Sequence, residues 1–170
     1  MIRVVALFAA LAAVYGVAHD QVTARVSLEY FTIAHARIVR SDSPALVGLA
    51  WGLLAGAPAG AIAGAMVGLA AGERALSKLG WRHFLPSALT LGAVMAVAAV
   101  LAGAGGHFLT ARGDVQMLAE FAPLVPRDRH ARFMAVVYAH LASFGVGLAG
   151  TVAIAVRTQR CRYGISRSPG

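Results

Sequence analysis

The side chains with which this chain could do chemistry are its six histidines and the polar residues of one stretch. The stretch, residues 15–40, reads YGVAHDQVTARVSLEYFTIAHARIVR, and His140 stands in an apolar segment much farther along the chain. Imidazole nitrogens combined with a carboxylate can bind zinc, copper or iron, and two imidazoles across a helix bundle can hold haem. The candidate ligands of such a metal ion or haem are His19, Glu29, His35 and His140.

The spacing of these side chains matches no local ligand motif such as HExxH, so a shared site depends on the fold. His140 needs a polar partner, because an ionisable side chain inside an apolar span is costly when it stands alone. Its simplest role is an interhelical hydrogen bond to Ser143, Thr110 or Tyr15, and the alternatives are proton relay and cofactor ligation. No nucleophile motif surrounds Ser143, so the sequence names no catalytic residue and favours a protein that is not an enzyme.

Four long uncharged runs must position these side chains. Hydrophobic residues make up 59% of the 170 residues and charged residues 13%, and the mean hydropathy is +0.71. This composition excludes a water-soluble enzyme, a DNA-binding domain and a disulfide-stapled secreted module. We predict an all-α fold, a polytopic transmembrane four-helix bundle that forms one domain over residues 1–170. The expected segments are spans at about 2–19, 45–72, 84–110 and 133–156, an external polar segment at 19–44 and a basic C-terminal tail at 157–170.

The first apolar run is the shortest, and it also has the form of a secretory signal peptide. Arg3 precedes the run, and Gly16 and Ala18 stand where a signal peptidase prefers small residues. Cleavage would leave three spans. Because the run leads without proline into His19, and residues 20–26 are compatible with continued helix, we favour a retained first helix.

The basic residues indicate orientation and not a nucleic-acid ligand. The formal net charge is +8, but Lys and Arg lie between and beyond the apolar runs and form no clustered basic face, so we expect no nucleic-acid binding. Lys and Arg resist translocation, and their density favours both termini in the cytoplasm, with the first and third loops outside. The residues on the cytoplasmic side are Arg3, Arg74, Lys78, Arg82, Arg157, Arg160, Arg162 and Arg167.

Small residues recur at every fourth position along the second and fourth runs, which places them on one face of each helix. In lipid such a face lets a neighbouring backbone approach closely. We predict close packing within one bundle, and the alternative is a homo-oligomeric or hinge-like pore. Pro58 should bend the second helix, because proline removes one backbone hydrogen bond. The predicted packing residues are Gly52, Gly56, Gly60, Gly64, Gly68, Gly72, Ser143 and Gly147.

These features predict an integral membrane protein with a structural or accessory role, which acts through helix packing and partner contact. The bilayer is its first partner, a membrane protein or a second copy of the chain could be another, and this interpretation requires no cofactor. The alternative is a metal- or haem-binding redox protein that uses the histidines of the outer face. A small transporter or channel is a further alternative, which the absence of a charged residue in the middle of any predicted span disfavours.

Three stretches resemble a family of small uncharacterised bacterial inner-membrane proteins: YGVAHDQVTARVSLEYFTIAH at 15–35, SPALVGLAWGLLAG at 43–56 and RHARFMAVVYAHLASFGVGLAG at 129–150. The similarity extends over most of the chain, and the block after the first helix is its most specific part. The resemblance implies a bacterial source and a multi-pass protein of the inner membrane, and it brings no activity. Relatives tend to have cysteine at the position of Ser27 and proline at that of Ala36, so Ser27 counts against a thiolate ligand here.

Overall fold

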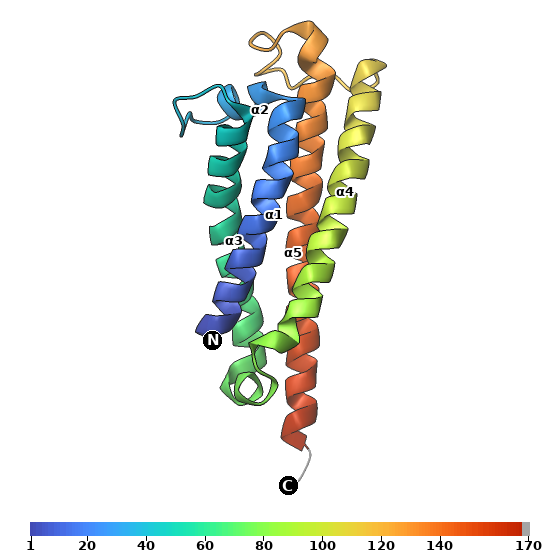
Figure 1. The fold of residues 1–170 in the computed structure, drawn as a ribbon. Coiled ribbons are helices and arrows are strands. Elements are labelled where there is room, and N and C mark those ends of the chain that lie inside the picture. Colours follow the sequence, from blue (N-terminus) through green and yellow to red (C-terminus); the bar gives the residue numbers. More distant parts are fainter. Residues whose placement is uncertain (168–170) are drawn as a thin grey trace.

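The computed structural model describes the backbone of residues 1–167 and the side chains of that range except 73–75, 77–79 and 161–167. Four long helices lie side by side, and together they form the predicted all-α four-helix bundle (Figure 1). The long helices are α1 (Ile2–Val26), α3 (Pro44–Leu79), α4 (Leu85–Ala111) and α5 (His130–Arg167), and the short ones are α2 (Leu28–Thr32), η1 (Trp81–Phe84) and η2 (Arg127–Arg129). The backbone of α5 continues into the predicted basic tail, of which residues 168–170 lie outside the described part.

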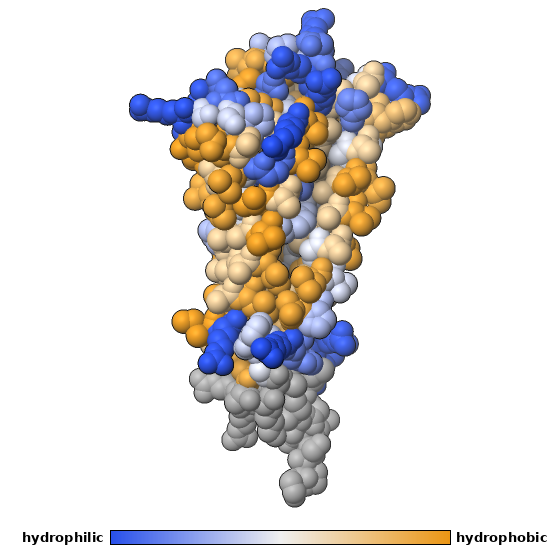
Figure 2. Space-filling model, in the orientation of Figure 1, coloured by the Kyte–Doolittle hydropathy of each residue, from blue (hydrophilic) through white to orange (hydrophobic). Residues whose placement is uncertain are grey.

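Each long helix contains a stretch that is long and apolar enough to cross a membrane. Many large apolar side chains, such as Val100 and Leu141, are exposed. On the face shown in Figure 2, apolar side chains fill the middle of the bundle and hydrophilic ones gather near its ends. Such a surface suits lipid, so the chain is an integral membrane protein with four candidate spans. The stretches are Ile2–Val26, Pro44–Gly72, Trp81–Ala111 and Arg127–Arg160.

The pair α1 and α3 has the most extensive contact of all helix pairs, and glycines of α3 allow the close approach. A Cβ atom added at Gly56 would lie 2.5 Å from the carbonyl oxygen of Ala12, and one added at Gly64 would lie 2.8 Å from the Cα of Val5. A side chain at either position would therefore collide with the backbone of α1. The α3 glycines that face the α1 backbone in this way are Gly48, which is not among the packing residues predicted from the sequence, and the predicted Gly52, Gly56, Gly60 and Gly64.

Two of the predicted packing residues on α5 meet different helices. A Cβ atom added at Gly147 would lie 3.2 Å from the Cε of Met95 on α4. The hydroxyl group of Ser143 is hydrogen-bonded to the hydroxyl group of Tyr15 on α1 at 2.7 Å. One face of α5 thus contacts both α4 and α1.

The series of α3 glycines that contact the α1 backbone ends shortly before a break in α3. Gly72 has φ 71° and ψ 162°, which are not helical, and the helix resumes and ends at Leu79. Glycine adopts a positive φ without strain because it has no Cβ. One turn earlier, a Cβ atom added at Gly68 would meet only the side chain of Met1, so the backbone contact with α1 has already ended. The sequence predicts a bend at Pro58, but the residue with non-helical dihedral angles inside α3 is Gly72.

The helix α1 continues to Val26, past the predicted end of the first span at His19. The hydroxyl group of Thr23 donates to the carbonyl oxygen of His19 at 3.1 Å, so this polar side chain bonds within the helix. Ser27 then takes an extended conformation with φ −149°, which ends α1. The extension places Asp20 and Thr23 inside the bundle, where both are buried.

Candidate functional site

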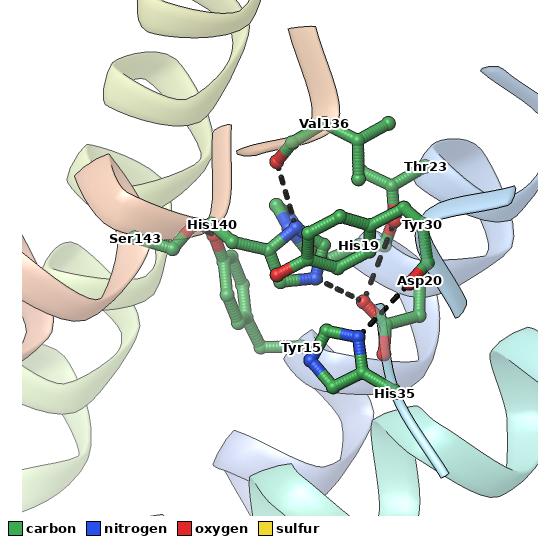
Figure 3. A network of polar contacts seen from close by, with 9 residues as sticks. All are labelled: Tyr15, His19, Asp20, Thr23, Tyr30, His35, Val136, His140 and Ser143. Carbon is green, nitrogen blue, oxygen red and sulfur yellow. Dashed lines mark hydrogen bonds and ion pairs between the residues drawn. The ribbon is translucent and has the colours of Figure 1, made fainter. Parts of the chain in front are cut away.

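Three ionisable side chains from two helices meet at the end of the bundle that carries α2, which we call the α2 end. His19 and Asp20 belong to α1, and His140 belongs to α5 (Figure 3). One ligand atom from each residue, an imidazole nitrogen or a carboxylate oxygen, lies within 4.8 Å of the other two. We call these three residues the His–Asp–His cluster.

A hydrogen bond within α5 orients the imidazole of His140. Its Nδ1 lies 2.9 Å from the carbonyl oxygen of Val136. Because a carbonyl oxygen can only accept, Nδ1 carries a proton and donates. The other ring nitrogen, Nε2, faces the cluster and lies 3.2 Å from Oδ1 of Asp20.

The contact between His140 and Asp20 requires a proton or a cation. A neutral imidazole with its proton on Nδ1 has only a lone pair at Nε2, and an ionised carboxylate also offers only lone pairs. Two lone pairs that face each other at 3.2 Å repel. The contact becomes favourable when a proton lies between the two atoms or when both atoms bind a metal ion.

The sequence predicts Ser143, Thr110 or Tyr15 as the partner of His140, and this prediction is wrong. The hydroxyl groups of Ser143 and Tyr15 bond to each other, and the hydroxyl group of Thr110 has no partner among the described residues. Asp20 takes this place because α1 remains helical beyond the predicted end of the span.

The carboxylate of Asp20 is buried and has few polar partners besides His140. Its side chain is only 7% exposed, and Thr23, at 3.4 Å, is its other hydrogen-bond partner in the described part of the chain. The Arg side chains that form ion pairs among the described residues pair with other carboxylates. Burial of an uncompensated charge is costly in a poorly solvated interior, so this site favours either a proton shared with His140 or a bound cation.

His19 brings a third ligand atom, an imidazole nitrogen, to the cluster. Its Nε2 is buried and has no hydrogen-bond partner among the residues that the structure describes. Its ring stacks on that of Tyr15 with centroids 5.7 Å apart and meets the ring of His140 edge to face at 4.6 Å. An unpaired buried polar atom costs about 1–3 kcal/mol, so a ligand at this nitrogen would stabilise the protein.

The helix α2 covers the cluster with aromatic side chains. The ring centroids of Tyr30 and Phe31 lie 4.6 Å and 5.8 Å from that of His140. Burial raises the pKa of Tyr30 to about 12, and the charge of Asp20 adds to this shift. The phenol of Tyr30 therefore stays protonated at neutral pH and covers the cluster as an uncharged group.

An ion pair holds α2 against η2, the short helix that leads into α5. Glu29 accepts a hydrogen bond from the hydroxyl group of Ser27 at 2.9 Å and forms a hydrogen-bonded ion pair with Arg129. Burial acts to raise the pKa of Glu29, but hydrogen bonds from Arg129, from its own backbone and from Ser27 outweigh burial and hold the pKa below the ordinary value of 4.5. Glu29 therefore anchors α2 and lies outside the cluster.

This ion pair should add a pH-dependent contribution to stability. Because folding lowers the pKa of Glu29, the contribution is fully present above the ordinary value of 4.5 and is lost as the pH falls through the lower folded value. The variant Glu29→Gln should unfold at a slightly lower temperature than the wild type at pH 7, and the difference should close as the pH falls below 4.5 and through the lower folded pKa of Glu29. Thermal unfolding in detergent across this range measures the effect. A difference that stayed constant with pH would show that Glu29 contributes no charge-dependent stability.

His35 lies beside the cluster and holds the chain that follows α2. Its Nδ1 donates to the carbonyl oxygen of Tyr30 at 2.9 Å, and its ring meets the ring of Trp51 edge to face at 5.1 Å. Through these two contacts His35 connects the segment after α2 to α3.

The structure thus changes the set of residues that share a site. It brings His19 and His140 together, whereas Glu29 and His35 have other partners. It adds Asp20, which is not among the ligands predicted from the sequence. The signal that could have identified Asp20 is its place next to His19 in a segment that is compatible with continued helix.

A cavity of about 650 Å³ lies between the α1–α3 pair and the α4–α5 pair. The cluster, Tyr30 and His35 line the cavity at the α2 end, and most of the remaining wall is apolar. None of the described residues that line it is Arg or Lys. The cavity therefore joins a polar end to a long apolar body.

Comparisons with protein-family models, with curated proteins and with solved structures find no match to this chain. Its function is therefore inferred from the chemistry of the cluster and of the cavity.

Proposed function

We propose that this integral membrane protein binds a divalent first-row transition-metal ion at His19, Asp20 and His140. Two imidazole nitrogens and one carboxylate oxygen suit zinc or ferrous iron and leave further coordination positions open. The observation that carries the proposal is the contact of His140 Nε2 with Asp20 Oδ1, which needs a proton or a cation. A metal ion would satisfy this contact and the unpaired Nε2 of His19 together, whereas a proton would satisfy the contact alone.

The distances support a single ion at the centre of the cluster. Tetrahedral zinc, with bonds of about 2.0–2.1 Å, separates its ligand atoms by roughly 3.3 Å. The separation of His140 and Asp20 is 3.2 Å, and the ligand atoms of all three residues lie within 4.8 Å. A movement of His19 by roughly 1.5 Å or less would complete the set. The hydrogen bond from His140 Nδ1 to a carbonyl oxygen is the kind of outer contact that orients a metal-binding imidazole.

Haem fits the cluster less well than a single ion. Two histidines that hold haem bind opposite faces of the porphyrin plane. The ring centroids of His19 and His140 are 4.6 Å apart, edge to face, which leaves no room for that plane between them. Of the two ligands that the sequence leaves open, a metal ion is therefore the one we propose.

Metal analysis of the purified protein tests this proposal. After incubation with zinc and removal of free metal, the wild type should retain about one ion per chain, and His140→Ala should retain less than roughly a tenth of this amount, because even outer contacts of metal ligands contribute about 10- to 100-fold in affinity. The matched control is His107→Ala, which removes an exposed histidine of α4 outside the cluster. It should retain as much zinc as the wild type.

Two results would contradict the metal proposal. Equal zinc in the wild type and in His140→Ala would place the metal elsewhere on the chain. Absence of zinc from both would leave a proton shared by His140 and Asp20 as the explanation of their contact.

We further propose that the protein lies in the bacterial inner membrane, with the α2 end outside and both termini in the cytoplasm. Support comes from the resemblance of residues 15–35 to a bacterial inner-membrane family and from the density of basic residues in the sequence. Met1 and the end of α5 lie at the opposite end of the bundle from α2 (Figure 1), as this orientation requires.

A structural or accessory role would act through the exposed apolar surface. Contact with lipid already explains exposed side chains such as Leu69 and Val100, so a partner protein or a second copy of the chain has no separate support there. Asp20 lies near the α2 end of its span, and this position gives no support to a transporter that needs a charge at mid-membrane. The cluster is therefore the preferred centre of function.

A further inference from the structure

The cavity beside the cluster opens toward lipid between α3 and α5. Six of its lining residues are exposed, and all of them belong to α3 or α5, whereas the lining residues of α1 and α4 are buried or only partly exposed. A lipid-soluble molecule could therefore enter from the bilayer without crossing water. The exposed lining residues are Ala55, Ala59, Ile62, Met66, Phe144 and Leu148.

The cavity is long enough for an extended apolar chain. Along α1 it reaches from Asp20 to Phe8, a distance of about 18 Å at the helical rise of 1.5 Å per residue. Glycine and alanine form much of its wall, for example Gly56 and Ala59 on α3 and Gly92 on α4. This shape suits a single long chain better than a compact ligand.

The α2 end of the cavity suits an uncharged head group. The hydroxyl groups of Tyr15 and Ser143 lie about one helical turn from the cluster, and because they share one hydrogen bond, the proton of one of them stays free to donate to a ligand. The carboxylate of Asp20 would repel the anionic head of a fatty acid or phospholipid, and no Arg or Lys among the described lining residues could pair with it. The aromatic rings of Tyr30 and Trp51 line the same end, where a flat ring can stack.

We propose that this cavity binds a lipid-soluble quinone. The flat, uncharged ring lies at the α2 end, where one of its carbonyl oxygens accepts a hydrogen bond from Tyr15 or Ser143. The isoprenoid chain extends along α1 toward Phe8. The cavity volume of about 650 Å³ is typical of small-molecule sites. This binding goes beyond the metal site and does not depend on it, because neither hydroxyl group is a proposed metal ligand.

Titration with decylubiquinone, a quinone with a short apolar chain, tests the proposal. Trp51 lines the cavity, so a bound quinone should quench its fluorescence. Purified protein in detergent, treated with EDTA to remove metal, should show saturable quenching. The variant Trp51→Phe should lose the saturable part and keep only a weak, non-saturable response.

A matched pair of variants locates the binding site. Ala59→Phe places a large ring in the cavity and should weaken quinone binding by about ten-fold or more, because overpacking displaces the ligand. Ala149→Phe makes the same change at an exposed position of α5 that does not line the cavity. This variant should therefore bind decylubiquinone with the affinity of the wild type.

Three outcomes would overturn the quinone proposal. They are non-saturable quenching of the wild type, equal affinity in the two phenylalanine variants, and competition by decanol or decanoate at the concentrations at which decylubiquinone binds. The last outcome would identify a site for a simple chain without recognition of the ring. Because the protein is free of metal in this titration, these results stand apart from the zinc analysis, and either proposal can fail alone.

Discussion

Replacement of Asp20 by asparagine should abolish metal binding and leave the metal-free protein about as stable as the wild type. The amide removes the anionic ligand, but when its NH2 group takes the place of Oδ1 its N–H can donate to the lone pair on His140 Nε2. Zinc affinity should fall by about 100-fold or more. The free energy of unfolding without metal should change by less than about 1 kcal/mol, because a buried ion pair and a neutral hydrogen bond of similar shape differ little in net stability.

Thermal unfolding with and without zinc measures both quantities. At a free zinc concentration of about 100 times the dissociation constant, bound metal stabilises the folded state by about 2.7 kcal/mol, and Asp20→Asn should lose this contribution. Glu29→Gln makes the same chemical change at a carboxylate that pairs with Arg129, and it should keep the zinc-dependent increase in unfolding temperature. If Asp20→Asn kept the increase as well, Asp20 would not be a ligand and the proposed centre would be wrong.

The existence of four long apolar helices could be predicted because it depends on local composition. A helix in lipid satisfies its own backbone hydrogen bonds, so an uncharged run of sufficient length is enough to form one. The third predicted span, at residues 84–110, corresponds to α4 at Leu85–Ala111. Predicting that such a helix exists needs no information about its neighbours.

The end of α1 is a different case, because it depends on packing. A charge is costly in lipid, so Asp20 looks like the point where an apolar run must stop. In the bundle, however, Asp20 is buried against His140, which is 120 residues away in the sequence. The hydrophobic periodicity of α1 or of α5 does not indicate that these two residues are in contact.

Residue type alone also could not show which carboxylate, Asp20 or Glu29, belongs to the cluster. Asp20 and Glu29 have the same chemistry and lie in the same polar stretch. Their surroundings separate them, because Glu29 pairs with Arg129 whereas Asp20 faces two imidazoles. Histidine and carboxylate chemistry near one end of the bundle was therefore predictable, and the identity of the carboxylate required the fold.

Replacement of Gly56 by alanine should force α1 and α3 apart and destabilise the bundle. The new Cβ would lie 2.5 Å from the backbone carbonyl oxygen of Ala12, which is too close for any real contact of a Cβ atom. The free energy of unfolding should fall by about 2–3 kcal/mol, as overpacking of a close interface does, even though alanine favours helix over glycine by about 0.8–1 kcal/mol. Unfolding by SDS, followed by circular dichroism, measures the loss.

Gly145→Ala is the matched control, because a Cβ atom added at Gly145 meets nothing within 4 Å. Both substitutions gain the same helix propensity, so the difference between them isolates the contact of α1 with α3. Gly145→Ala should be neutral or slightly stabilising. If the two variants unfolded at the same SDS fraction, the backbone contact at Gly56 would contribute no stability. The α1–α3 pair would then depend on its buried larger side chains, such as Phe8 and Val67, and the close glycines would only permit the approach.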